Sequence, residues 1–444
     1  MACIYFVAPF RPITGHIAEY TSFITRELSP RNWRILCFDP ATSGATFIAG
    51  HRLMRHRLWH GSTEPTYDTI PSIVQQSGVD PREGIVLWFQ HENTPWPNEW
   101  QLIEMLKCLD LPKVITFHSL HFESSETPLG LRKAEFTLLE RVLPHVEAIT
   151  VFSEGARGAI AAAFAHHAAK VHLLRYGVSI YPHALRMTPR EAKKTLHEFL
   201  VNCPELGHAC RKALEEERIF LDPDTFVIGN AGFVPPRRHS DRLFMIRDIL
   251  QQMLPRRRIV ALRIATPQDE EQATHMRTMK LQQDQVSKFL IETQLPESMI
   301  PIALRAFDVN FCWPGEGVSG NILSRILGSG GVIAGQDLEE TGETLKEAGA
   351  IAERELGLLV FSIYRLAVNP EEADRIRENA IAYATRFSWE KQARIHRALA
   401  ERLAHPSEIT PLPRPSDRSE KHKGRNPPRV RFTAASSGSE IQQG

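Results

Sequence analysis

The sequence lacks any long apolar run. No stretch approaches the roughly 18–20 consecutive apolar residues that span a bilayer. The first apolar stretch, Cys3–Phe10, has no basic start and contains Pro9. A secretory signal peptide needs a basic beginning and a longer apolar stretch. We therefore expect a soluble, cytoplasmic protein.

The sequence also lacks an excess of positive or negative charge and any closely spaced pair of cysteines. The 53 Lys and Arg residues nearly cancel the 52 Asp and Glu residues, so the composition gives no support to nucleic acid as a partner. The six cysteines include no CxxC pair, so neither a zinc ribbon nor a redox dithiol is indicated. Cys3, Cys37 and Cys312 lie in apolar, strand-like runs, and we expect reduced, buried thiols.

The chain has 444 residues, a length typical of about two to three domains. In its first half, short β-branched runs alternate with helical patterns, which predicts βαβ units and a mainly parallel sheet. The expected strands are Ile4–Ala8, Trp33–Phe38, Gly84–Phe89, Lys113–Phe117, Ala148–Phe152 and Lys170–Leu174. The expected helices are Ala18–Leu28, Glu99–Cys108, Leu131–Leu143 and Gly155–Ala165.

A polar, helical segment (184–220) separates this half from a second one, and we interpret it as a linker or helical insertion. The alternation then resumes at Thr225–Asn230, Leu243–Leu254, Arg258–Ile264, Val286–Ile291, Ala306–Cys312, Asn321–Leu327, Gly331–Ala334 and Gly357–Phe361. We expect two doubly wound, Rossmann-like α/β domains (1–183 and 221–385) and a C-terminal helix (386–404). Ligands of such sheets lie beyond the carboxyl ends of the strands.

The last segment, 405–444, differs in composition. It holds six prolines, seven Lys or Arg and four Asp or Glu, with few large apolar side chains. Such a segment buries too little apolar surface to offset the entropy of ordering. We expect a disordered, solvated tail.

The stretch Trp313–Asn321 places the single carboxylate Glu316 between two glycines, in front of a helix that should begin near Ser319. Free backbone N–H groups at a helix N-terminus favour anions, because the aligned peptide dipoles place partial positive charge there. An acid in the same turn accepts hydrogen bonds from hydroxyls. The turn therefore suits a ligand with a diphosphate and sugar hydroxyls, and the alternative is an exposed turn with Ser319 as N-cap.

Two further loops follow expected strands. Asn230–Asp241 carries the adjacent Arg237 and Arg238, whose fork-shaped, always charged groups suit a diphosphate; the alternative is a solvated basic loop. His118 ends the strand next to Phe89–Asn93 and can donate to a sugar hydroxyl, with a structural histidine as the alternative. Gly15, after the first strand, would let a ligand approach the backbone closely.

Taken together, these stretches resemble glycosyltransferase family 4, the retaining sugar-nucleotide transferases with the GT-B fold. The resemblance covers about residues 3–402 and depends on the order and spacing of its landmarks. The landmarks are Pro9–Ala18, Phe89–Glu92 with Val114–His118, Ile149–Arg157 with Tyr176–Val178, Gly232–Arg238, and Pro314–Glu316 through Gly331–Ile333. The closing runs Gly357–Val360 and Phe387–Glu390 are also similar to the family.

The resemblance implies a role for each matching position. His118 would contact the donor sugar, Glu316 would bind its hydroxyls, and Arg238 would stand at the place of a phosphate-binding lysine. The other donor-binding positions would be Gly15, Gly232, Arg237, Val318, Ser319, Gly320 and Asn321. No metal or cofactor is expected, since the helix end and the cationic side chains stabilise the leaving diphosphate.

The sequence departs from the family pattern at four places. The second glutamate of the family lies eight residues after the first, where this chain has Ser324, so the usual ribose contact is absent or altered. Phe233 replaces a basic residue, His239 replaces a glycine, and Thr14 precedes the single Gly15 of the first loop. A subset of the family carries a Glu-x-Ser-Gly loop, to which residues 316–320 are loosely similar.

We interpret the chain as a glycosyltransferase whose two domains face a cleft. It would move a hexosyl unit from a nucleoside-diphosphate sugar to a glycan, a lipid or another acceptor, with retention. The family's habits point to polysaccharide or glycolipid assembly, with peripheral contact at the inner membrane face. One alternative is a degenerate protein that binds nucleotide sugar or a partner without transfer, and another is a GT-B epimerase, for which persuasive acid and base carboxylates are lacking.

Overall fold

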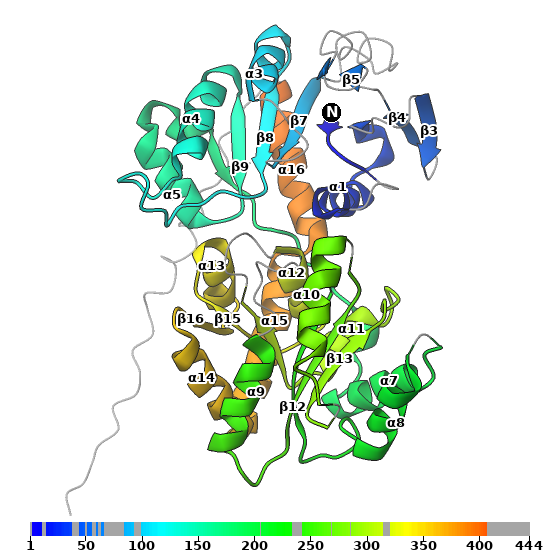
Figure 1. Ribbon diagram of the computed structural model, residues 1–444. Helices are drawn as coiled ribbons and strands as arrows, with labels where there is room; N and C mark the ends of the chain where they lie inside the picture. The colour runs from blue at the N-terminus through cyan, green and yellow to red at the C-terminus, as the bar shows by residue number, and fades with distance from the viewer. Residues whose placement is uncertain are drawn as a thin grey trace, which may run out of the picture. The chain divides into compact units, whose positions relative to one another are not determined.

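In the computed structural model, residues Met1–Ala404 form one compact unit and His405–Gly444 form another. The structure describes residues 2–10, 15–37, 44–48, 51–55, 59–60, 64–65, 84–92, 99–204, 206–232, 242–267, 269–284, 286–313 and 320–405. The first unit contains two sheets, each covered by helices (Figure 1). The expected disordered tail (406–444) lies outside the described residues.

The first sheet has eight strands in the order β10-β9-β8-β7-β1-β2-β4-β3. Every pair is parallel except β3 with β4. The strands are β1 (Cys3–Val7), β2 (Trp33–Cys37), β3 (Gly44–Ile48), β4 (His51–Arg55), β7 (Ile85–His91), β8 (Lys113–Phe117), β9 (Ala148–Val151) and β10 (Val171–Leu173). A short hairpin of β5 (Trp59–His60) and β6 (Glu64–Pro65) is separate.

The second sheet has six strands, all parallel, in the order β13-β12-β11-β14-β15-β16. They are β11 (Phe226–Ala231), β12 (Ile259–Ala265), β13 (Lys288–Glu292), β14 (Val309–Cys312), β15 (Ile333–Gln336) and β16 (Ile351–Glu353). The near-continuous apolar sequence of strands such as Ile259–Ala265, all of it buried, is what a parallel sheet covered on both faces requires.

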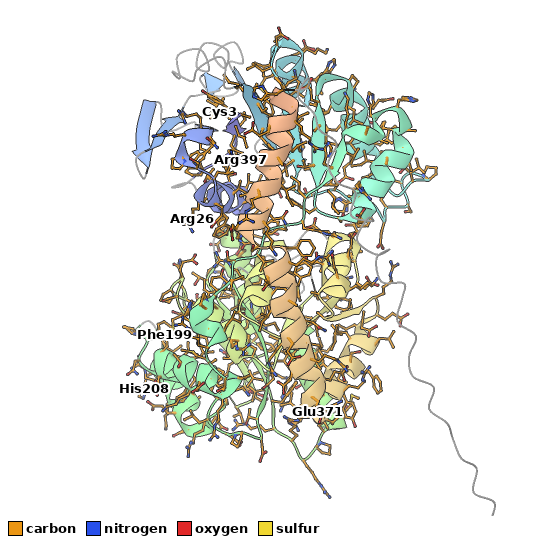
Figure 2. The ribbon with its side chains drawn as sticks, turned by 180° about the vertical axis from the view of Figure 1, so that it is seen from behind. Cys3, Arg26, Phe199, His208, Glu371 and Arg397 are labelled. Carbon is orange, nitrogen blue, oxygen red and sulfur yellow. The ribbon has the colours of Figure 1, made fainter. Side chains whose placement is uncertain are left out.

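Helices cover both faces of the first sheet. Side chains of α3 (Glu99–Cys108), α4 (Lys133–Val142) and α5 (Glu154–Ala163) pack on one face. The opposite face packs against α1 (His16–Glu27) and α16 (Trp389–Ala404), the last helix of the unit. Figure 2 shows α16, which carries Arg397, from behind. The chain therefore returns at its end to complete the core of its first sheet.

The second sheet is covered in the same way. On one side lie α7 (Pro189–Val201), α8 (His208–Glu217), α11 (Ile300–Ala306) and α12 (Gly320–Gly328). On the other lie α9 (Arg242–Met253), α10 (Glu270–Lys280) and α14 (Leu356–Val368). Buried residues of α15 (Pro370–Arg386) contribute to the hydrophobic cores on both sides of the second sheet. Leu345 of α13 (Glu339–Glu347) belongs to the core on the side of α7, α8, α11 and α12. The remaining helical segments are α6 (Pro182–Leu185) and the 3₁₀ turns Pro30–Asn32, Leu143–His145 and Ala165–Lys170.

The segment expected as a linker or insertion packs on the second sheet. Lys193 of α7 lies 2.6 Å from Asp308 Oδ2, and the same oxygen accepts a 2.7 Å hydrogen bond from the Val227 backbone. Figure 2 labels Phe199 and His208 on α7 and α8. The ion pair joins the segment to strand β11 and to the residue that precedes β14.

The chain crosses between the two sheets twice, and the crossings lie side by side. Val178 donates a 2.9 Å backbone hydrogen bond to Phe387, and Trp389 donates one of 3.3 Å to Val178. A Cβ added at Gly177 would lie 2.2 Å from the Trp389 ring. Glycine at 177 therefore lets the Trp389 ring, at the start of α16, pack against the segment that leads from the first sheet to the second.

Several sequence-based expectations need correction. The run Gly357–Phe361 lies inside helix α14, and strand β16 comes before it at Ile351–Glu353; Leu359 and Val360 are buried, whereas Leu358 and Phe361 are exposed. Ala306 ends α11 and does not begin β14. Cys3 and Cys312 are buried as expected; Cys203 is buried as well, and Cys108 is exposed. The side chain of Cys37 lies outside the described part. Among the described helices, none is long and apolar enough to cross a membrane.

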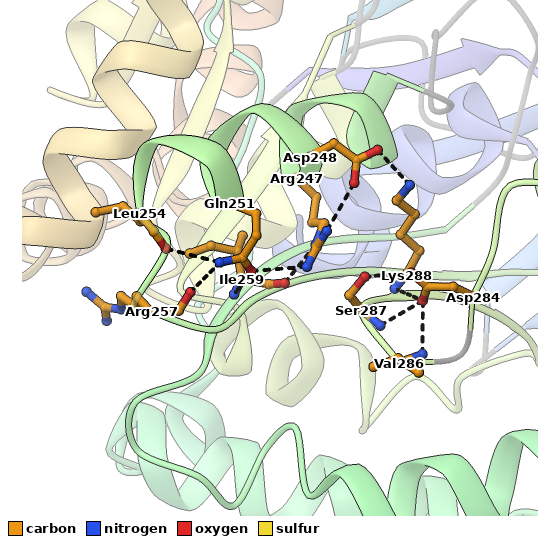
Figure 3. Close-up of polar contacts among 10 residues, drawn as sticks. All are labelled: Arg247, Asp248, Gln251, Leu254, Arg257, Ile259, Asp284, Val286, Ser287 and Lys288. Carbon is orange, nitrogen blue, oxygen red and sulfur yellow. Dashed lines mark hydrogen bonds and ion pairs between the residues drawn. The ribbon is translucent and has the colours of Figure 1, made fainter.

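A network of polar contacts fixes one edge of the second sheet (Figure 3). The Asp284 carboxylate accepts hydrogen bonds of 2.7–2.9 Å from the backbone N–H groups of Val286, Ser287 and Lys288. Burial raises the pKa of this carboxyl, but the hydrogen bonds to Ser287, Val286 and Lys288 outweigh burial and lower the pKa to about 2. The carboxylate thus stabilises the turn that leads into β13.

Replacing Asp284 by Ala should lower the free energy of unfolding by about 1 kcal/mol at pH 7, since the backbone donors lose a charged acceptor but can bond to water at this exposed turn. The folded pKa of Asp284 is depressed, so its contribution is present above about pH 4 and is lost as the pH falls toward about 2. Urea unfolding at several pH values measures this. Asp374→Ala, which removes a 71% exposed carboxylate, is the control; equal effects of the two variants at pH 7 would contradict the prediction.

Candidate functional site

The strand order of each sheet reverses once between parallel neighbours, and loops at such a reversal diverge to leave room for a ligand. In the first sheet the reversal lies between β1 and β7, and in the second between β11 and β14. Gln90 and His91 end β7, and Gly232 directly follows β11. These described positions therefore lie at the two reversal points.

His118 follows β8, next to the first reversal point, and only 3% of its surface is exposed. Its Nε2 lies 2.7 Å from Gln90 Oε1, and its ring packs edge-on against Tyr20 at 4.8 Å between centroids. Phe152 and His16 lie 5.3 Å and 5.7 Å away. Burial, together with the nearby His16, His91 and His396, holds the pKa of His118 well below its usual value, so the ring is neutral at pH 7.

The end of β7 adds two more polar side chains. Burial lowers the pKa of His91 to about 4, so this ring is also neutral. Glu92, the next residue, lies 3.1 Å from His16 Nε2 at the start of α1. These contacts tie the first helix to the carboxyl end of β7, on the side where His118 lies.

Two glycines named as donor-binding positions have backbone conformations that other residues rarely adopt. Gly15 has φ +149° and Gly232 has φ +117°, and a Cβ at either position would meet no atom of the described residues within 4 Å. The backbone conformation therefore favours glycine at both positions. Gly15 lies directly before α1, as its N-cap, and Gly232 directly after β11.

Helix α12 meets α1 across the two halves of the unit. The Asn321 side chain donates to Glu19 Oε2 and accepts a 3.1 Å hydrogen bond from Arg325 Nε. Arg325 also pairs with Glu19 at 3.3 Å and with Glu297 at 3.0 Å. The start of α12 and the start of α1, both predicted to flank the donor, are therefore joined by charged and amide groups.

The ends of the two loops of the second sheet lie close together. Arg263, buried in β12, donates to the Asn230 side chain and, at 3.0 Å, to the Gly232 carbonyl. Asn230 donates at 2.8 Å to the Phe311 carbonyl in β14. After the loops, the Arg242 guanidinium lies 5.7 Å from the centre of the Trp313 ring. Both ends of the basic loop thus contact the strand that leads to the Glu316 turn.

The predicted site residues fall into two groups. His118, Gly15, Gly232, the Gly320 backbone and Asn321 are described, with Gly15 and Asn321 belonging to the joined helix starts. Glu316, Arg237, Arg238, Val318 and Ser319 lie outside the described residues, so their roles stay predictions. Ser324 is buried, and its hydroxyl donates at 2.9 Å to the Asn321 carbonyl inside α12.

Sequence reasoning missed an acidic helix, α13, that joins the halves. Glu339 accepts hydrogen bonds of 2.9 Å and 3.2 Å from the backbones of Phe122 and Glu123. Glu343 accepts from the backbones of Glu154 and Gly155, at 2.7 Å and 3.0 Å, where α5 begins. Glu343 also pairs with Arg175, which lies 2.8 Å from Glu347. The amphipathic pattern of α13 signals a surface helix and carries no sign of this interface.

Glu340 of α13 is 7% exposed. Burial raises the pKa of its carboxyl to about 8; Arg175 opposes the shift, and Glu343 and Glu339 reinforce it. The carboxyl is therefore mostly protonated at neutral pH. Burial raises the pKa values of Tyr20 and Tyr176, and Glu340 adds a smaller contribution in the same direction.

Among the described residues, no group of three or more His, Cys, Asp or Glu side chains could hold a metal ion. The absence of a metal requirement remains a prediction. The polar groups at the carboxyl ends supply hydrogen-bond partners and one helix N-terminus, which is the chemistry of anion and hydroxyl binding.

Comparison with known proteins gives structural matches. No family model matches the chain, and no curated protein matches its sequence. A UDP-forming α,α-trehalose-phosphate synthase from Burkholderia vietnamiensis is similar, with TM-score 0.63 and 11% identity over 93% of this chain and 100% of that one. A sucrose-phosphate synthase from Thermosynechococcus elongatus matches with TM-score 0.61 and 14% identity over 91% and 100%.

A third match is the UDP-forming trehalose-phosphate synthase of Burkholderia xenovorans in complex with glucose-6-phosphate, with TM-score 0.61 and 12% identity over 90% of this chain and 100% of that one. At these identities the likeness shows the fold alone. The chain has the GT-B fold, with two Rossmann-like parallel-sheet domains, as the sequence predicts. The matches do not single out glycosyltransferase family 4, so membership of that family stays a prediction.

Replacing Glu343 by Ala should destabilise the junction of the two halves, because the start of α5 and the largely buried Arg175 lose an acceptor. We expect the free energy of unfolding to fall by about 1–3 kcal/mol and the amides of Glu154 and Gly155 to exchange faster. Denaturant unfolding and hydrogen exchange measure these effects. Lys346→Ala on the same helix removes a 60% exposed side chain and should change the free energy by less than about 1 kcal/mol; an equal loss would count against this role.

Replacing Glu340 by Gln should change the pH dependence of stability. Because the folded pKa is raised to about 8 from 4.5, the wild-type protein loses stability as the pH rises between these values, by at most about 1.4 kcal/mol per pH unit. The variant should match the wild type near pH 4.5 and exceed it at pH 8.5. Thermal unfolding in a pH series tests this, and parallel curves would show that Glu340 ionises normally.

Proposed function

We propose that the protein is a glycosyltransferase that moves a hexosyl unit from a nucleoside-diphosphate sugar to an acceptor, with retention at the anomeric carbon. One observation carries the proposal. The helix starts that follow the predicted donor loops in the sequence, those of α1 and α12, are joined by Glu19, Asn321 and Arg325. A ligand between those starts would touch both halves of the fold.

In this proposal each group acts on a part of the donor. The backbone N–H groups at Val318–Gly320 and the guanidinium of Arg238, with Arg237, bind the diphosphate. Glu316 and His118 hold the sugar hydroxyls. As the bond between sugar and diphosphate breaks, negative charge grows on the leaving oxygen, and fixed donors and cations stabilise it without reorganising. We assign no side chain as nucleophile.

The junction of the halves would protect the reaction from water. Contacts from α13 and from Glu19 join the halves without a bound ligand. Exclusion of water strengthens the electrostatic interactions with the diphosphate and limits hydrolysis of the donor. The neutral rings of His118 and His91 add no charge that would have to be desolvated.

The structural neighbours suggest which substrates to test first. Two are UDP-forming, and one was studied with glucose-6-phosphate. Another is a trehalose-6-phosphate synthase studied for glycosyl transfer with retention. We therefore propose a UDP-sugar as the first donor and a sugar phosphate as the first acceptor. Glycans and lipids at the inner membrane face, which the family 4 resemblance suggests, form the second set.

A second candidate is a degenerate protein that binds nucleotide sugar, or a partner, without transfer. The position of the family's second glutamate favours it, because Ser324 is buried and its hydroxyl is used inside α12. A side chain so engaged does not reach a ribose. The two candidates differ in turnover and not in binding.

Turnover separates these candidates. With UDP-, GDP- or ADP-glucose and glucose-6-phosphate, the wild-type protein should release nucleoside diphosphate, and Arg238→Ala and Glu316→Ala should each lower the rate by about 100-fold or more. Arg157→Ala, at a 48% exposed helical pair, should leave the rate unchanged. Binding seen by thermal shift with no release over the full donor and acceptor set would support the degenerate reading.

A further inference from the structure

The ring of His118 has one nitrogen in a hydrogen bond and one without a partner. Nε2 lies 2.7 Å from Gln90 Oε1. Nδ1 is buried and has no hydrogen-bond partner among the residues that the structure describes. A buried polar atom left in this state is costly, and an exception of this kind at a predicted site points to a missing partner.

Gln90 is itself fully buried at the end of β7, in register with Thr116 of β8. In the structure the amide of Gln90 turns Oε1 to the ring, and its Nε2 is buried without a partner among the described residues. A carbonyl oxygen can only accept, so in this arrangement the facing Nε2 of His118 carries the proton of the neutral ring. Nδ1 then presents a lone pair. The sequence suggested that His118 donates to a sugar hydroxyl; the contact with Gln90 leaves Nδ1 as an acceptor.

We propose that Gln90 is a positioning residue that holds His118 in the Nε2–H tautomer, so that Nδ1 accepts a hydrogen bond from a hydroxyl of the donor sugar. The inference rests on the proposed glycosyltransferase function and adds a specific role to it. This role accounts for the burial of His118 against aromatic rings. Burial keeps the imidazole ring neutral, and only a neutral ring has the lone pair on Nδ1 that can accept a hydrogen bond.

The groups facing His118 agree with this assignment. His16 and Tyr20 face it from α1, His91 lies at the end of β7, and His396 lies on α16. Each of these histidines disfavours a charge on His118, and burial does so most. Glu92 contacts His16, and Tyr20 is held by a 3.0 Å hydrogen bond to His396 Nε2.

The tautomer can be read directly. Long-range ¹H–¹⁵N spectra of histidine-labelled full-length protein distinguish protonated from unprotonated ring nitrogens, and His118→Gln identifies the signals. We expect a protonated Nε2 and an unprotonated Nδ1 from pH 6 to pH 8. Gln90→Leu should lose this single tautomer, whereas Thr150→Val, which removes another buried hydrogen bond of the sheet (2.8 Å to Thr116), should keep it. A protonated Nδ1 in the wild type overturns the inference.

Binding gives a second readout. Titrations with UDP-glucose and with UDP isolate the contribution of the sugar. Gln90→Leu should weaken UDP-glucose by roughly three- to tenfold with little change for UDP, and Thr150→Val should change neither. In Gln90→Glu the new carboxylate should raise the pKa of His118, so that the affinity for UDP-glucose falls as the pH drops from 8 to 6, while the wild type stays flat. A constant or rising affinity in Gln90→Glu would show that His118 donates and would overturn the inference.

Failure of the inference is distinguishable from failure of the proposed function. If nucleoside diphosphate is released from a donor but Nδ1 carries the proton, the inference fails and the transferase remains. If no sugar nucleotide is bound or consumed, the proposed function fails, and the sugar contact of Nδ1 fails with it.

Discussion

The constraint on which this structure depends is that its two sheets are almost entirely parallel. A parallel sheet needs helices on both faces, so its faces are closed and its carboxyl edge is where functional loops gather. In the first sheet the cover is completed only by α16, whose Trp389 and His396 reach back across the whole chain to the residues around Tyr20. The end of the sequence therefore helps to build the surroundings of His118, although it carries no predicted site residue.

This dependence explains what the sequence could and could not predict. Strands such as Lys113–Phe117 and the helix Glu99–Cys108 agree residue for residue, because apolar periodicity and flanking turn residues are local signals. Gly15 and Gly232 were named from the sequence for a different reason, close approach of a ligand and the family resemblance, and both have positive φ values, which glycine adopts readily. These features lie within a few residues of the pattern that predicts them.

The contacts between the two halves could not be predicted from the sequence. Glu19 meets Arg325, and Glu343 meets Arg175, across separations of 306 and 168 residues. On their own helices these acids are ordinary polar-face residues, and their partners are backbone amides or distant arginines. The run Gly357–Phe361 shows a second limit. A short apolar run fits a strand or a buried helical turn equally well, and here its neighbours Leu356–Val368 continue the helix.

Because the same contacts join the two halves, the affinity for a ligand that touches both halves and the stability of the junction between them should be thermodynamically coupled. Glu19, Glu339 and Glu343 neutralise backbone or guanidinium groups on the opposite half, so most of this interface charge is paired before a donor arrives. If the proposed function holds, a donor that touches His118 from one half and α12 from the other would favour the joined arrangement. By linkage, anything that stabilises that arrangement must in turn favour the donor. Substitutions in α13 that touch no substrate are then expected to alter affinity, and the sign of that change follows from whether they tighten or loosen the junction.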